Sequence, residues 1–161
     1  MTATEITTSI KDRTATLKRV FDAPAALLFE VHSTPEHMKQ WWGPQQWPLT
    51  TCEMEFRTGG AFRFAMTGPG GEKGAPFGGR YLEVTPNTKI VYDNGFLDDP
   101  KQETMVVTLT FDERADGTTV LTSHTVFASV SMAEEHIGQG FADGTASSLD
   151  NLAKYLADRR R

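Results

Sequence analysis

Alternating apolar and polar positions predict β-strands over much of the chain. Residues 14–20 alternate and predict a first strand, and six further segments with the same period lie between residues 49 and 127. Turns rich in Gly, Pro and Asp separate these segments. In the segment 103–111, one face is entirely apolar (Met105, Val107, Leu109 and Phe111). We therefore expect this face of the sheet to be buried.

The remaining segments have helical patterns. Two short helices are predicted within 21–33 and 33–42, and the second begins with Thr34 as N-cap and Pro35 at the first helical position. After "SVSMAEE", which ends at residue 135, the pattern predicts one long helix to the end, in which the i, i+3, i+4, i+7 positions are apolar (Leu149, Leu152, Ala153 and Leu156). Asp150 and Lys154 are expected to form an exposed pair on it.

The predicted order is a strand, two short helices, six strands and one long helix. It indicates a single α+β domain over residues 1–161, in which a curved seven-stranded antiparallel sheet packs its concave face against the C-terminal helix. Such a sheet leaves room for a cavity beside the helix. Gly138, Gly140 and Gly144 indicate either a close approach of another element or space beneath the helix.

Composition and charge narrow the function classes. The 161 residues have a net charge of −5 and no basic stripe, which argues against nucleic-acid binding. The N-terminus lacks a signal-peptide core, and no apolar run has the length of a membrane span, so the expected location is cytoplasmic. Cys52, the only cysteine, is predicted to be a buried apolar residue rather than a reactive thiol.

Three tryptophans lie in "MKQWWGPQQWP", residues 38–48, between Gly43, Pro44 and Pro48. One interpretation is that all three pack in the core or at its rim. The other is that Trp42 contacts a ligand, since small-molecule pockets use aromatic walls with few polar groups. Trp47 is expected to be partly exposed.

Further side chains are candidates for the wall of a pocket, although each also suits plain core packing. The complete ligand-binding prediction consists of Trp42, Phe56, Phe62, Phe64, Phe77, Tyr81, Glu83, Tyr92, Phe96, Met105, His124 and Phe141. Glu83 shares strand parity with Tyr81 and is expected to face the same way, as a pocket acid or as half of an ion pair with an arginine. His124 is the candidate for titration near neutral pH if its side of the strand faces inward.

Sequence motifs for catalysis or metal binding are missing. The chain has no HExxH, CxxC or GxSxG pattern, and the four histidines are not at metal-ligand spacing. We therefore predict no catalytic residue, no metal and no cofactor.

A family resemblance covers about residues 12–157. The segments "FDAPAALLFEVHSTPEHMKQWWGP", "FRTGGAFRF", "GGRYLEVTP", "TLTFDERADGTT" and "ASSLDNLAKYL" resemble homologues of the activator of heat-shock-protein-90 ATPase. That family is part of the START-like (SRPBCC) helix-grip superfamily, which includes the Bet v 1 allergens and polyketide cyclases. The resemblance implies a sheet that grips a long C-terminal helix, with a hydrophobic cavity between them.

Three hypotheses about function follow. The favoured one is a non-catalytic domain that binds a small apolar or amphipathic molecule, in a stress or detoxification setting. The second is an enzyme of the cyclase or aromatase kind, with Glu83, Tyr81 or His124 as pocket acid or base. The third is a co-chaperone-like module that binds a chaperone or another protein through the surface around Trp47. Either a monomer or a homodimer is compatible with the sequence.

Overall fold

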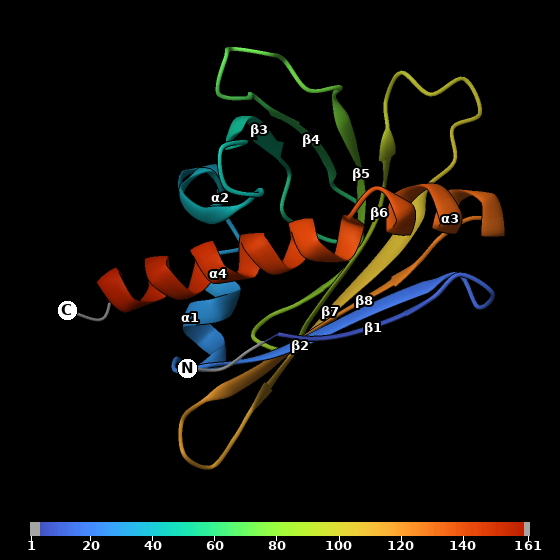
Figure 1. Cartoon of the computed structure of the whole chain (residues 1–161). Helices are drawn as coiled ribbons and strands as arrows, with labels where there is room; N and C mark the ends of the chain where they lie inside the picture. The colour runs from blue at the N-terminus through green and yellow to red at the C-terminus, as the bar shows by residue number, and fades with distance from the viewer. Residues whose placement is uncertain (1–3, 160–161) are drawn as a thin grey trace.

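The computed structural model describes residues 4–159 and contains one antiparallel sheet and four helices (Figure 1). The strands are β1 (Glu5–Ser9), β2 (Thr14–Phe21), β3 (Leu49–Met54), β4 (Ala61–Met66), β5 (Phe77–Thr85), β6 (Lys89–Phe96), β7 (Met105–Glu113) and β8 (Thr119–Val126). The helices are α1 (Ala25–Glu30), α2 (Pro35–Trp41), α3 (Val130–Gly138) and α4 (Phe141–Arg159). The order across the sheet is β1-β2-β8-β7-β6-β5-β4-β3.

The α+β helix-grip architecture is confirmed, but the prediction of seven strands was wrong. The sheet has eight strands, because residues 5–9 form an additional edge strand, so the short helices follow the second strand. This strand is almost wholly exposed and pairs only with β2, so no buried face imposes an apolar alternation on it. Periodicity therefore gave no signal for it.

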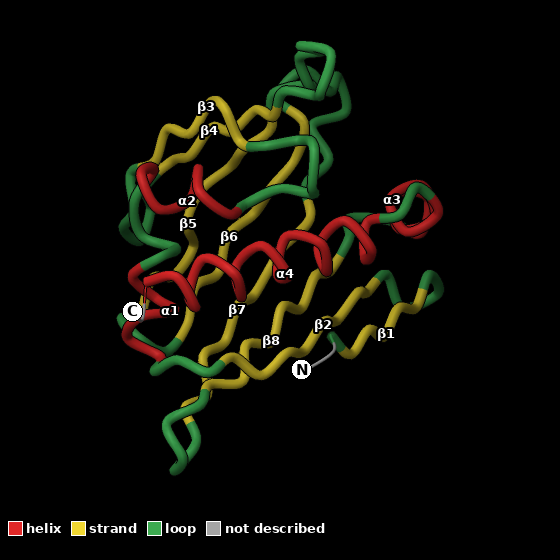
Figure 2. The backbone as a smooth tube through the Cα atoms, turned by 60° about the vertical axis from the view of Figure 1, so that its left-hand side comes forward, coloured by secondary structure: helices red, strands yellow, loops and turns green. Residues whose placement is uncertain are grey.

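Helix α4 crosses the concave face of the curved sheet, and α2 lies between α4 and the β3 edge (Figure 2). Thr34 caps α2 as predicted, since its side chain accepts a hydrogen bond from the His37 N–H. The predicted apolar face of β7 is buried, with Met105, Val107, Leu109 and Phe111 each no more than 9% exposed. These positions form the floor beneath α4.

An ion pair fixes α4 against β2. Arg19 points inward from β2, is 8% exposed, and bonds the Asp150 carboxylate on α4. Asp150 was predicted to pair with Lys154 along the helix surface, and that prediction was wrong. A guanidinium that is buried under a helix needs a carboxylate partner, and this need outweighs a weak surface pair.

The C-terminal helical region is interrupted rather than continuous, which corrects the prediction of one long helix. α3 ends at Gly138, Gly140 has a φ of +90°, and α4 begins at Phe141. A positive φ is incompatible with an α-helix and is adopted readily by glycine. Gly144 lies inside α4, where a Cβ would meet only Pro44 Cγ at 3.8 Å, so this glycine leaves space at the helix surface.

Cys52 is buried, as expected, and burial raises the pKa of its thiol to about 11. We predict that 5,5′-dithiobis(2-nitrobenzoate) reacts with the folded protein about tenfold or more slowly than with the urea-unfolded chain, because the thiolate is the reactive species. The measurement is the absorbance of the released thiolate over time. Equal rates in both states would contradict a protected thiol.

Candidate functional site

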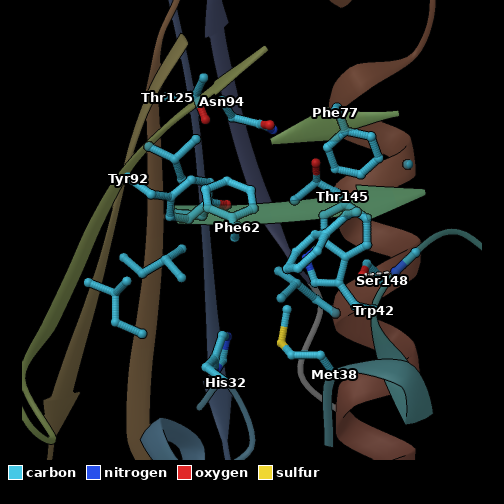
Figure 3. A pocket seen from close by; sticks show the side chains of 18 of the residues that line it. His32, Met38, Trp42, Phe62, Phe77, Tyr92, Asn94, Thr125, Thr145 and Ser148 are labelled. Atoms are coloured by element: carbon cyan, nitrogen blue, oxygen red, sulfur yellow. Dashed lines mark hydrogen bonds between the residues drawn. The ribbon is translucent and has the colours of Figure 1, made fainter. Parts of the chain in front are cut away.

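A cavity of about 250 Å³ lies between the sheet, α2 and α4. Its floor comes from β6, β7 and β8, and its side wall comes from β4, β5 and the end of α2 (Figure 3). Phe141, Gly144, Thr145, Ser148 and Leu149 of α4 line the opposite side. The lining is mainly apolar, which is typical of small-molecule sites.

Aromatic rings make the side wall. Trp42 lies with its ring centroid 5.6 Å from that of Phe64 and 5.5 Å from that of Phe77. Phe62 packs against Tyr81 at 5.2 Å and against Tyr92 at 5.5 Å. These distances are those of ordinary aromatic pairs, so the wall is held in place by the rings themselves.

Trp41 and Trp42 have different surroundings although they are neighbours. Trp41 is 4% exposed, donates its Nε1–H to the Val31 carbonyl at 3.1 Å, and packs on the His32 ring at 4.9 Å. Trp42 is only half-buried, and its ring faces Phe64 and Phe77. Both residues touch the cavity, but Trp41 is embedded in the core and Trp42 forms the wall.

His32 lies at one end of the cavity, with Met38 near it (Figure 3). Its Nδ1 is 2.7 Å from the Leu28 carbonyl oxygen, and since a carbonyl only accepts, Nδ1 carries the proton. Burial lowers the pKa of His32 to about 4, so the ring is neutral at pH 7. Its Nε2 therefore keeps a lone pair.

The hydroxyls of Tyr81 and Tyr92 belong to the same lining. Burial raises the pKa of each phenol well above its ordinary value, so both remain protonated at neutral pH. Among the described residues, neither hydroxyl has a hydrogen-bond partner. The cavity thus combines apolar rings with neutral polar groups.

Most of the residues predicted to bind a ligand line this cavity. They are Trp42, Phe56, Phe62, Phe64, Phe77, Tyr81, Tyr92, Met105 and Phe141. Their contact with a ligand stays a prediction. Glu83, Phe96 and His124 are not among the lining residues, for three separate reasons.

Glu83 does not face the same way as Tyr81, because a β-bulge intervenes. Tyr81 pairs with Tyr92 and Glu83 pairs with the next residue, Val91, so the β5 strand contains one extra residue here. A bulge reverses the alternation beyond it. The Glu83 carboxylate is accordingly exposed and lies 3.7 Å from Lys89 Nζ, rather than in the cavity or beside an arginine.

Phe96 and His124 lie outside the cavity for reasons of position. Phe96 is at the end of β6, is 49% exposed, and stacks on His136 of α3 at 6.1 Å. His124 is on the outer face of β8, because Ser123 and Thr125 on either side of it are buried. Its Nδ1 is hydrogen-bonded to the Thr16 hydroxyl at 2.8 Å.

Sequence reasoning missed the polar lining residues other than the tyrosines, namely His32, Asn94, Ser123, Thr125, Thr145 and Ser148. Strand parity held a signal for three of them, since Asn94 alternates with Tyr92, and Ser123 and Thr125 alternate with Leu121. His32 follows a helix end and has no periodic signal. Within residues 4–159, no group of His, Cys, Asp and Glu could hold a metal ion.

The comparisons with known proteins agree with this geometry. The family model described as "Activator of Hsp90 ATPase homolog 1-like protein" matches residues 22–157. A crystal structure of a protein from Mycobacterium smegmatis is 24% identical, with a TM-score of 0.86 and coverage of 99% of each chain. A solution structure from Staphylococcus epidermidis is 28% identical, with a TM-score of 0.80 and coverage of 96% of this chain and 94% of that one.

A further solution structure, from Arthrobacter aurescens, is 22% identical, with a TM-score of 0.87 and coverage of 96% of this chain and 91% of that one. No curated protein matches the chain significantly.

The fold and its cavity define a helix-grip protein of the START-like superfamily. The chain belongs to the family of Activator of Hsp90 ATPase homolog 1-like proteins. Between residues 4 and 159, no helix has the length and apolar character needed to cross a membrane.

Proposed function

We propose that the protein binds a small, mainly apolar molecule in the cavity between the sheet and α4, without catalysing its conversion. The observation that carries this proposal is the cavity itself, about 250 Å³ in volume and walled by the rings of Trp42, Phe62 and Phe77. Native cores are close-packed, and voids larger than a water molecule are few. An apolar space of this size is therefore a site for a ligand rather than a packing defect.

The arrangement of ionisable groups favours binding over acid–base catalysis. Of the three residues predicted as pocket acid or base, Glu83 and His124 lie outside the cavity. Tyr81 remains, and its pKa is raised by burial, so it is a poor proton donor at neutral pH. Trp47, around which the surface hypothesis places a docking protein, is half-buried in agreement with its expected partial exposure, but this leaves only a small apolar surface there for docking.

Filling the cavity tests the proposal. Gly144→Leu adds a side chain at a position where a Cβ would make one van der Waals contact and no clash. Leucine also has a higher helix propensity than glycine. We expect naphthalene, titrated into ¹⁵N-labelled protein and followed by NMR, to shift the amides around the cavity. The variant should bind about tenfold or more weakly, because it loses the space for at least one ring.

Gly138→Leu is the matched control. This glycine ends α3 and is exposed, and a Cβ attached to it would have no neighbouring atom within 4 Å, so the added side chain leaves the cavity unchanged. Naphthalene should bind it as it binds the unchanged protein. If naphthalene shifts no cavity amide, or if both variants weaken binding equally, the cavity is not a ligand site.

A further inference from the structure

The polar groups of the cavity are divided unequally between its walls. On the α4 wall they are already engaged, since the Thr145 hydroxyl donates to the Phe141 carbonyl at 2.9 Å and the Ser148 hydroxyl accepts from the Gly43 N–H at 2.8 Å. On the sheet wall, among described residues, the hydroxyls of Ser123 and Thr125 have no hydrogen-bond partner. The unused hydrogen-bonding capacity is therefore on the sheet.

Asn94 is the clearest example of a polar side chain at the cavity without a hydrogen-bond partner. Its Oδ1 is buried and has no hydrogen-bond partner among the described residues, although the side chain lines the cavity. Buried polar atoms in native proteins are nearly always hydrogen-bonded, and an exception calls for an explanation. A group supplied by a bound molecule is a direct explanation.

Asn94 and Thr125 lie close to the same end of the cavity, opposite His32 (Figure 3). Both flank β7, because Asn94 pairs with Met105 and Thr125 pairs with Val107. The Met105 and Val107 side chains are buried between them. Asn94 and Thr125 thus place one polar group on each side of β7, in a floor that also contains the hydroxyls of Ser123 and Tyr92.

Charge is missing from the lining. No described residue that lines the cavity is Asp, Glu, Lys or Arg. The single imidazole there, His32, is neutral at pH 7 because burial lowers its pKa to about 4. An ion that entered would lose its hydration without gaining a counter-charge, which is strongly unfavourable.

The volume limits the size of the occupant. An apolar cavity of about 150 Å³ in another protein holds benzene, and drug-sized molecules use pockets of roughly 300 Å³ or more. At about 250 Å³, this cavity lies between these cases. It suits one or two fused rings, packed against the face of Trp42 and Phe77.

We infer that the cavity takes a neutral molecule of one or two rings that carries a hydroxyl group, and that Asn94 and Thr125 hydrogen-bond this hydroxyl. The inference rests on the proposed function and specifies its ligand class. A hydroxyl both donates and accepts, so it can bond the side-chain amide of Asn94, once this amide turns toward the cavity, while it accepts from the Thr125 hydroxyl. The rings then occupy the apolar part of the cavity.

Three ligands of the same ring size test the inference: naphthalene, 2-naphthol and 2-naphthoate. We expect 2-naphthol to bind about tenfold or more tightly than naphthalene, because each satisfied buried hydrogen bond favours it. The carboxylate should bind most weakly at pH 7. Dissociation constants come from NMR titration of the ¹⁵N-labelled protein.

Asn94→Leu and Thr125→Val remove the polar groups with little change in shape. Each should abolish most of the preference for 2-naphthol and leave naphthalene binding unchanged. Neither should unfold the protein, since the groups removed bond no described residue. Thr122→Val, on the outer face of the same strand, is the control and should keep the preference.

The outcomes separate this inference from the proposal on which it rests. If naphthalene binds but 2-naphthol is not preferred, or if both variants keep the preference, the ligand class is wrong and the cavity remains a binding site. Tight binding of 2-naphthoate would also overturn it. If none of the three ligands shifts a cavity amide, the proposed function fails as well.

Discussion

Replacing Trp41 with alanine is expected to lower the free energy of unfolding by about 3–5 kcal/mol, the usual cost of removing a buried tryptophan. Trp41 is 4% exposed, and its ring packs on His32 and bonds the Val31 carbonyl. The variant leaves a void and an unpaired carbonyl at the junction of α1 and α2. Domains of this kind have a free energy of unfolding of about 5–15 kcal/mol, so the substitution would remove a large fraction of it. Urea denaturation followed by far-UV circular dichroism measures the loss.

Trp42→Ala is the matched comparison. Trp42 is half-buried and contacts Phe64 and Phe77 at the cavity wall, so its removal should cost about 1–2 kcal/mol of stability. It should instead weaken naphthalene binding about tenfold, since the ring that faces the ligand is gone. An equal loss of stability in the two variants would mean that both tryptophans serve only the core.

The different roles of these neighbours illustrate what the sequence could reveal. The short helix predicted within residues 33–42 ends with both tryptophans, and in the structure Trp41 is the last residue of α2 and Trp42 is its C-cap. Period-2 alternation also identified the buried face of β7, because burial on one side selects apolar residues at every second position. Elements with one buried face were therefore predictable from the residues alone.

The errors arose where that condition fails. β1 has no buried face, so its residues Glu5–Ser9 show no pattern. The bulge after Tyr81 turns Glu83 to the opposite face of the sheet from the one that strand alternation predicts. The pattern of apolar and polar residues does not indicate where such a bulge occurs. His32 enters the cavity from a turn, where neither period applies. The aromatic residues of the cavity wall could be predicted from their residue type. Whether a polar residue faces the cavity depends on strand register and on turns, which the sequence pattern does not give.

Acidification should destabilise the protein through His32. Burial lowers the pKa of this imidazole to about 4, against an ordinary value near 6.5 in the unfolded chain. Between these two values the unfolded chain binds a proton that the folded protein excludes, so stability is present above pH 6.5 and is lost as the pH falls. From pH 7 to pH 5 the expected loss is about 2 kcal/mol, and it levels off below the folded-state pKa.

Urea denaturation at pH 7 and pH 5 measures this loss, and His32→Leu identifies its source. The variant removes the titrating group, so it should reduce the difference in stability between the two pH values by about 2 kcal/mol. His136 contributes in the same direction, since partial burial lowers its pKa, and this contribution should persist in the variant. His124→Asn, on the outer face of β8, is the control and should keep the full loss from His32. The His32→Leu variant and the unchanged protein could instead lose the same stability between pH 7 and pH 5. That result would mean that His32 is protonated in the folded protein and that the end of the cavity beside it is open to water.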